Sequence, residues 1–137
     1  MPNEKKDDIM SSMNKRVETR WGYWEELCHD ESLGFRVKIL VLYPGKEISL
    51  QYHDKRSEHW AVIKGDGMFT LDNMQMMIGR DDGLHVPLKM VHKVANIGSV
   101  SLVIVETQIG ICDEKDITRL EEIEGLTNEP FGEDQEG

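Results

Sequence analysis

Short segments of the chain alternate hydrophobic with polar residues, which is the period of two that strands show. Branched aliphatic and aromatic residues supply many of the hydrophobic positions, as is typical of sheets. We expect strands over 21–28, 35–43, 48–53, 58–65, 67–71, 74–78, a short stretch leading into Pro87, 91–95 and 99–107. About nine short strands at intervals of roughly 8–12 residues predict an all-β fold that is closed or sandwiched.

One segment has the helical period instead. Ile117, Leu120 and Ile123 recur at three-residue spacing, which places them on one face of a helix. An aspartate at either of two positions near the start of the segment can cap its first turn. We therefore expect a short C-terminal helix over 113–124, docked on the outside of the sheets.

Length and composition are those of one soluble domain. The chain has 137 residues, of which 39% are hydrophobic and 31% charged. It has no apolar run long enough to span a bilayer and no signal-peptide pattern at its start, so we expect a cytoplasmic protein without a membrane partner. Cys28 and Cys112 are the only cysteines and predict no disulfide framework.

The net charge of −10 is unevenly distributed, because seven acidic residues and no basic ones follow Arg119. An acidic chain without a basic stripe is a poor partner for nucleic acid, and we exclude that class of function. We expect three parts in the chain. They are a polar N-terminal arm over 1–17, one folded domain over 18–124 and an acidic, solubilising C-terminal tail over 125–137.

Four polar residues are spaced as ligands of one metal ion. Gln51 and His53 share a strand face, and a turn over 54–57 lets a hairpin bring Glu58 back towards them. His92 begins a later strand and is the best candidate for a fourth ligand. Each residue alone also fits a hydrogen-bonded position in a barrel mouth, but the set together favours a metal site. These donor types suit Zn, Mn, Fe, Co or Ni.

Two motifs carry a resemblance to a known family. The first is Pro44-Gly45, five residues, Gln51-x-His53, four residues, Glu58, six residues and Gly65; the second is Pro87, four residues, His92, three residues and Asn96. Together they resemble the paired motifs of the cupin superfamily. The variant Gln-x-His followed by Arg-Ser-Glu-His-Trp resembles the cupin domain of type II mannose-6-phosphate isomerases. Further similar segments lie at 19–25, 50–51 and 116–121, so the likeness covers about 18–122.

The resemblance implies a single jelly-roll barrel, the double-stranded β-helix, and a metal-dependent aldose-ketose isomerase. The substrate would be a phosphorylated hexose, with mannose 6-phosphate and fructose 6-phosphate as the pair. One divalent ion, zinc first and Mn, Co, Fe or Ni otherwise, would be held by Gln51, His53, Glu58 and His92. The resemblance also implies a homodimer.

Further residues receive roles from the same resemblance. Arg56 would contact substrate phosphate or developing negative charge, and Arg20 and Arg119 offer positive charge to an anionic sugar. Proton transfer falls to Lys55, Lys89 or His59. His59, however, alternates out of phase with Glu58, and the period of two favours a structural role for it. The tryptophans are expected in the core; they are Trp21, Trp24 and Trp60.

The chain departs from the isomerase pattern in two places. Asp54 and Lys55 stand where those enzymes have a run of histidines, and Lys89 stands where they have glycine. Those enzymes are also usually fused behind a nucleotidyltransferase domain. The departures keep two alternatives open: another metallocupin enzyme, such as a dioxygenase or a lyase, and a non-catalytic sugar-binding cupin.

Overall fold

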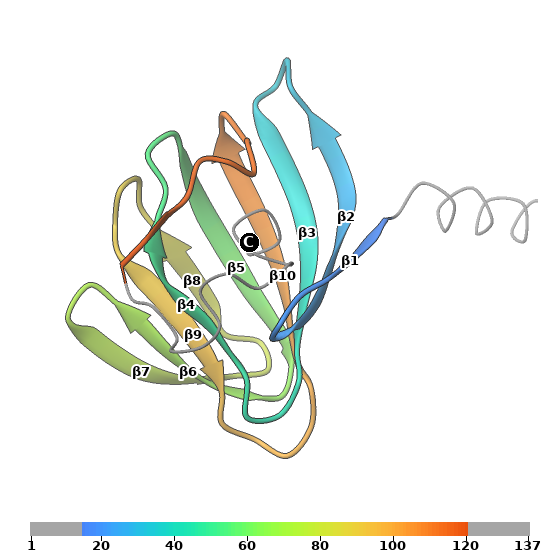
Figure 1. Cartoon of the computed structure of the whole chain (residues 1–137), viewed down its shortest axis with the longest axis vertical. Coiled ribbons are helices and arrows are strands. Elements are labelled where there is room, and N and C mark those ends of the chain that lie inside the picture. The colour runs from blue at the N-terminus through green and yellow to red at the C-terminus, as the bar shows by residue number, and fades with distance from the viewer. Residues whose placement is uncertain (1–14, 121–137) are drawn as a thin grey trace, which may run out of the picture.

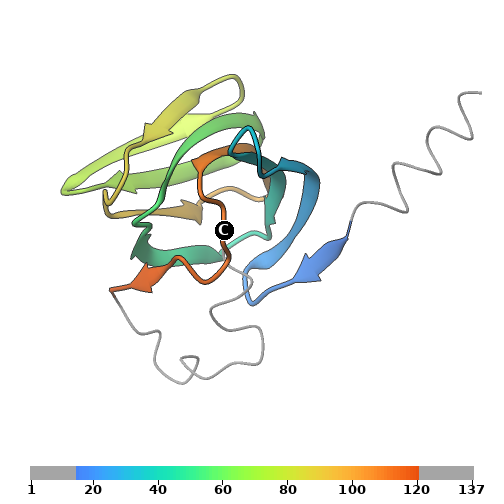
Figure 2. The same cartoon turned by 90° about the horizontal axis from the view of Figure 1, so that it is seen from above.

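The computed structural model describes residues 15–120 as two antiparallel sheets that face each other around one interior (Figure 1). The six-stranded sheet has the order β1 (Arg16–Glu18), β2 (Gly22–Asp30), β3 (Phe35–Leu42), β10 (Leu102–Gly110), β5 (Arg56–Lys64) and β8 (Gly83–Val86). The five-stranded sheet has the order β11 (Thr118–Arg119), β4 (Glu47–Tyr52), β9 (His92–Asn96), β6 (Asp66–Leu71) and β7 (Met74–Gly79). Figure 2 looks at the barrel from above, where the strands surround the interior. The predicted all-β jelly roll is confirmed.

Two short strands were not expected. β1 begins at Arg16, within the stretch that the sequence assigns to the polar arm, and pairs with β2. β11 lies within the expected helix and pairs with β4. The rest of the predicted arm and the acidic tail fall outside the described residues.

The helix expected over 113–124 is wrong for the residues that the structure describes. Residues 113–120 form a turn followed by β11, and no helix occurs within residues 15–120. The remaining part of that expectation, 121–124, lies outside the described range. The segment is extended because Leu120 donates its backbone N–H to Leu50 and two residues pair with β4, so sheet hydrogen bonds replace a weak helical pattern.

The sequence also predicts that 48–53 and 58–65 pair as a hairpin, and this pairing is wrong. β4 pairs with β9 and β11, whereas β5 pairs with β10 and β8 in the other sheet. The chain therefore crosses between the sheets at 53–55. His53 and Glu58 consequently approach each other across the barrel interior, and not along one ladder.

Along three adjacent strands of the six-stranded sheet, the inward-facing side chains change from apolar to polar. Over 36–42 of β3, 102–108 of β10 and 56–62 of β5, the even-numbered side chains point inward and stand in rows across the sheet. One row is Leu40, Ile104 and Val62; the next is Lys38, Glu106 and Trp60; the next is Arg36, Gln108 and Glu58. We call the half that contains the first row the apolar end and the half that contains the last row the polar end.

The core fills the apolar end and the space between the sheets. Its buried side chains come from both sheets: Trp21, Trp24, Leu40, Leu42, Ile48, Trp60, Val62, Phe69, Ile78, Val86, Val94, Leu102 and Ile104. The three tryptophans belong to it, as predicted.

Cys28 and Cys112 are free thiols. Cys28 is exposed because a register shift between Glu26 and Cys28 interrupts the alternation of β2. The described residues include no helix long and apolar enough to cross a membrane.

Candidate metal centre

The four predicted ligands come from three strands and one corner, and all lie at the polar end. Gln51 on β4 stands in register with His92 on β9, so the five-stranded sheet supplies both. His53 follows β4 at the crossing between the sheets, and Glu58 lies on β5 opposite them. The exposed fractions of these four residues are between 0% and 2%, so the barrel interior withdraws the whole set from solvent.

The two imidazoles converge on one carboxylate. His53 Nε2 lies 3.3 Å from Glu58 Oε2, and His92 Nε2 lies 3.8 Å from Glu58 Oε1. Candidate ligand atoms of the three residues all lie within 4.8 Å of one another. A single ion of the size of Zn²⁺ or Mn²⁺ needs its donors about this close, with each about 2.0–2.3 Å from the ion.

Backbone carbonyls fix the tautomer of both histidines. His53 Nδ1 lies 2.6 Å from the carbonyl oxygen of Asp116, and His92 Nδ1 lies 3.0 Å from that of Met90. A carbonyl oxygen only accepts, so each Nδ1 carries the hydrogen and donates it. Each Nε2 then keeps its lone pair and points it towards Glu58, which is the arrangement that metal-ligating histidines show.

Two buried acceptors at the centre lack partners. Within residues 15–120, neither His92 Nε2 nor Gln51 Oε1 has a hydrogen-bond partner. Leaving a buried polar atom without a partner costs free energy, and a cation between two imidazoles, a carboxylate and an amide oxygen would remove that cost. The donors present therefore fit a divalent metal.

The protonation states also suit metal binding. Burial lowers the pKa of His53 to about 4, and burial likewise lowers the pKa of His92. Burial alone would raise the pKa of Glu58, but the neighbouring His53 and Arg56 outweigh it and lower that pKa to about 2. Both imidazoles are neutral and the carboxylate is ionised near neutral pH, which are the forms that bind a metal.

Arg56 is buried, with an exposed fraction of only 2%. A position at the tip of a hairpin would instead have exposed it. Its Nε donates to Glu58 Oε2 at 2.9 Å, its Nη1 donates to the carbonyl of Asp113 at 3.2 Å, and its Nη2 lies 3.3 Å from His53 Nε2. Arg56 opens β5 in the inward phase and stands in register with Gly110, where an added Cβ would collide with the backbone of Lys55. The glycine lets the two strands close over Arg56.

Residues that sequence reasoning missed surround Glu58. Glu106 is fully buried, and its Oε1 accepts a hydrogen bond from Gln108 Nε2 at 2.8 Å. Burial, followed by the charge of Glu58, raises the pKa of Glu106 well above its usual value, which favours its protonated form, and that form can donate a hydrogen bond to Glu58. The alternation of β10 could have predicted their burial, because Glu106 and Gln108 continue the inward-facing positions of Leu102 and Ile104.

The remaining predicted site residues lie outside this cluster. Lys55 and Lys89 are exposed at the rim, and Lys89 has a left-handed φ of 63° while its backbone N–H donates to the carbonyl of His53. Arg20 and Arg119 are half-buried. His59 points away from the centre and its ring stacks on His85 at a centroid distance of 4.4 Å, as its phase in β5 predicts. Catalytic roles for these residues stay predictions.

Comparison with known proteins identifies similar domains. The family model described as "Mannose-6-phosphate isomerase C-terminal" matches residues 6–122. The "Alginate biosynthesis protein AlgA" of Pseudomonas aeruginosa is 37% identical over 111 residues, which are 80% of this chain and 23% of that protein. The "Mannose-1-phosphate guanylyltransferase ManC" of Salmonella typhimurium is 29% identical over 111 residues, again 80% of this chain and 23% of that protein. The chain thus spans about a quarter of the length of these relatives.

Among solved structures, a protein from Klebsiella pneumoniae described as an uncharacterized conserved protein with a double-stranded β-helix domain is similar with a TM-score of 0.62. The two sequences are 17% identical, and the match covers 80% of this chain and 85% of that chain. A likeness of this kind shows the fold, which is the double-stranded β-helix that the cupin motifs predict.

Proposed function

We propose that this chain, which belongs to the mannose-6-phosphate isomerase C-terminal family, is a metal-dependent aldose-ketose isomerase of a phosphorylated sugar. One observation carries the proposal. Two histidines, locked by backbone carbonyls with Nε2 unprotonated, face one buried and ionised carboxylate beside an amide oxygen without a partner. The similarity to a mannose-1-phosphate guanylyltransferase supports a sugar phosphate as the class of substrate.

In this proposal His53, Glu58, His92 and Gln51 hold the ion. A divalent cation supplies Lewis-acid polarisation of a substrate carbonyl or hydroxyl oxygen, which eases transfer of a proton between adjacent carbons. The protonated form of Glu106, which burial favours, donates a hydrogen bond to the Glu58 carboxylate and keeps its own proton, so only one of the two buried carboxyl groups is charged. Trp60 Nε1 donates to Glu58 Oε1 at 3.0 Å and fixes the orientation of the carboxylate.

Arg56 contributes a permanent positive charge. Its guanidinium contacts both Glu58 and His53 and therefore lies where negative charge on a substrate oxygen would be stabilised. Lys55 and Lys89 project from backbone beside His53 and face solvent, so they are proposed to meet the substrate at the rim. Exclusion of water follows from the burial of the centre.

Elemental analysis and an activity assay on the full chain test the proposal. We expect about one divalent ion per chain in the wild type, loss of the ion in His53→Ala and in His92→Ala, and retention in His59→Ala, which alters an outward-facing histidine of β5. The metal-loaded protein should interconvert mannose 6-phosphate and fructose 6-phosphate and should lose this activity with a chelator. Metal that binds without turnover of either sugar phosphate would support a binding cupin, and oxygen uptake by the iron form would support another metallocupin enzyme.

A further inference from the structure

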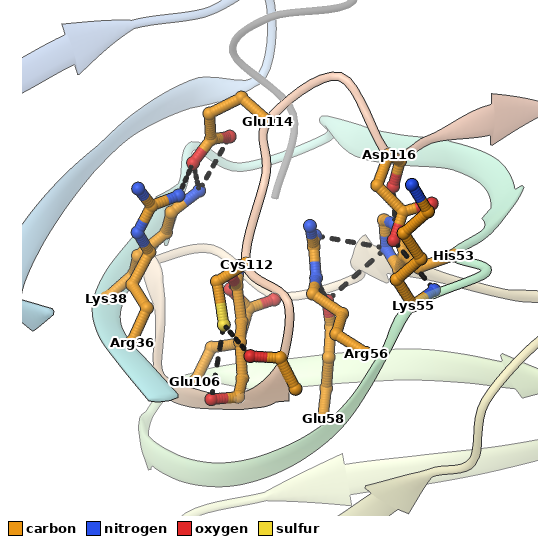
Figure 3. A network of polar contacts seen from close by, with 12 residues as sticks. Arg36, Lys38, His53, Lys55, Arg56, Glu58, Glu106, Cys112, Glu114 and Asp116 are labelled. Carbon is orange, nitrogen blue, oxygen red and sulfur yellow. Dashed lines mark hydrogen bonds and ion pairs between the residues drawn. The ribbon is translucent and has the colours of Figure 1, made fainter. Parts of the chain in front are cut away.

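A strap of chain, residues 112–116, crosses the polar end of the barrel and covers the candidate metal centre (Figure 3). Its backbone accepts from Arg56 at Asp113 and from His53 at Asp116. The Asp116 carboxylate accepts from the backbone N–H groups of Asp54 and Lys55, both at 2.9 Å. Glu58 and both histidines are at most 2% exposed, and the strap is a segment that covers them through its contacts with His53 and Arg56.

Glu114 of the strap binds two cations of the barrel wall. Its carboxylate contacts Arg36 Nη1 and lies 2.8 Å from the Nζ of Lys38. Arg36 and Lys38 are successive inward-facing residues of β3, and the Lys38 side chain has 0% exposure while that of Glu114 has 23%. The ammonium group of Lys38 also lies 3.8 Å from the centre of the Trp24 ring. The two cations are thus fixed in the wall, and the anion is carried on a covering segment.

A cavity adjoins this ion pair. It has a volume of about 530 Å³, and Arg36, Glu114, His29, Glu31 and Cys112 are among the residues that line it. Arg36 stands in the same row as Glu58, with Gln108 between them. Two strand spacings, about 10 Å, therefore separate the backbone positions of Arg36 and Glu58, a span that a six-carbon sugar phosphate can bridge.

We infer that Arg36 and Lys38 form the binding site for the phosphate group of the ligand, and that the Glu114 carboxylate fills this site until phosphate displaces it. The inference rests on the proposed function for the presence of a phosphate on the ligand. A phosphate dianion offers three oxygens and more charge than a carboxylate, and it matches the planar guanidinium in two-point contact. Displacing Glu114 frees the middle of the strap, so phosphate recognition is coupled to access to the centre and a sugar without phosphate does not open it.

Binding of inorganic phosphate to the full chain, measured by calorimetry before and after chelation of metal, tests the inference. Glu114→Gln should bind phosphate more tightly than the wild type by on the order of tenfold, because the carboxylate that contacts both cations is gone, while Glu26 keeps its contact with Arg36 Nε. Lys38→Met and Arg36→Met should each lose binding. Glu31→Gln is the matched control: it removes one negative charge from an exposed residue of the same cavity wall and should leave binding unchanged. Mannose 6-phosphate should compete with phosphate, whereas mannose should not.

Equal phosphate affinity in Glu114→Gln and the wild type would overturn the inference, and so would binding that survives in both cation variants. Arg36→Met serves if Lys38→Met does not fold, since Arg36 lies nearer the surface. The assay needs no turnover. A chain that fails as an isomerase can still show this pattern, and an active isomerase can fail to show it.

Movement of the strap gives a second readout. Cys112 belongs to the strap and is half-buried, with its Sγ near the backbone carbonyls of Gln108 and Gly110. In a Cys28→Ser background, phosphate should raise the rate of Cys112 alkylation several-fold, and Glu114→Gln should raise it without phosphate. A rate that is independent of both would contradict displacement of the strap.

Discussion

The two ends of the barrel are built from the same strands and differ in what their inward positions contain. At the apolar end, Leu40, Ile104 and Val62 form a row in which no side chain needs a hydrogen bond. Two rows further along the same three strands, Arg36, Gln108 and Glu58 occupy equivalent positions. The backbone geometry is shared, so the difference between core and candidate site lies in the side chains alone.

This contrast separates two sources of stability. Burial of apolar area stabilises the apolar end, at roughly 25 cal/mol per Å². The polar end is held by mutual compensation, since Glu58, Arg56, Glu106 and Lys38 are each buried and each has an opposite charge or a hydrogen-bond donor beside it. Removing one member there leaves the others without compensation, whereas removing one methyl group at the apolar end affects its neighbours only by contact.

The largest effect is therefore expected at the polar end. Arg56→Met should destabilise the metal-free chain by about 3–5 kcal/mol, because it leaves the Glu58 carboxylate buried without its guanidinium partner. Unfolding in urea measures the loss. The double variant Arg56→Met/Glu58→Gln should recover most of it, since the uncompensated charge is gone. If the single and double variants were equally unstable, packing would hold the polar end as it holds the apolar end, and charge compensation would not distinguish the two.

Truncating a buried side chain at the apolar end gives the stability change to compare with that of Arg56→Met. Leu40→Ala should cost roughly 2–5 kcal/mol through lost burial and the cavity left behind, because Leu40 is fully buried. The affinity of the folded fraction for metal should stay at the wild-type value, as Leu40 lies two rows from Glu58. Leu33→Ala is the control, since Leu33 is 75% exposed and a surface change should alter the free energy of unfolding by less than about 0.5 kcal/mol. Weakened metal binding in folded Leu40→Ala would show that the two ends are coupled.

The apolar end was the easier part to predict from sequence. Alternation in β3, β5 and β10 is a local property, and the strands it predicts occur in the structure with boundaries shifted by a few residues. The set Gln51, His53, Glu58 and His92 could also be predicted, because the two motifs carry it in their spacing. The structure brings those residues together, while the metal itself stays a prediction.

The pairing of strands that are distant in sequence could not be predicted from local patterns. A turn at 54–57 is compatible with a hairpin and with a crossing between sheets, and only the partners of β4 and β5 decide between them. The same choice buries Arg56, which a hairpin tip would expose. The helical spacing of Ile117 and Leu120 gave way to pairing with β4 for the same reason.

The smallest expected effect is the pH dependence of stability that His53 contributes at the polar end. Burial lowers the pKa of His53 to about 4 in the folded chain, compared with its usual value of 6.5 in an unfolded chain. Between these values the unfolded chain binds the additional proton, so this histidine makes the metal-free protein less stable as pH falls. The change amounts to about 2 kcal/mol between pH 7 and pH 5.

A variant is needed to observe this effect, because Glu106 acts in the opposite direction. Its raised pKa means that the folded chain binds the additional proton, and its contribution to stability is lost as pH rises. His53→Asn removes one titration and leaves the other, so its stability relative to the wild type should improve by about 2 kcal/mol from pH 7 to pH 5 in urea unfolding of metal-free protein. His59→Asn, on the outer face of β5, should show no such trend. A difference between His53→Asn and wild type that does not change with pH would mean that His53 titrates alike in both states, and the neutral imidazole assigned to the polar end would be wrong.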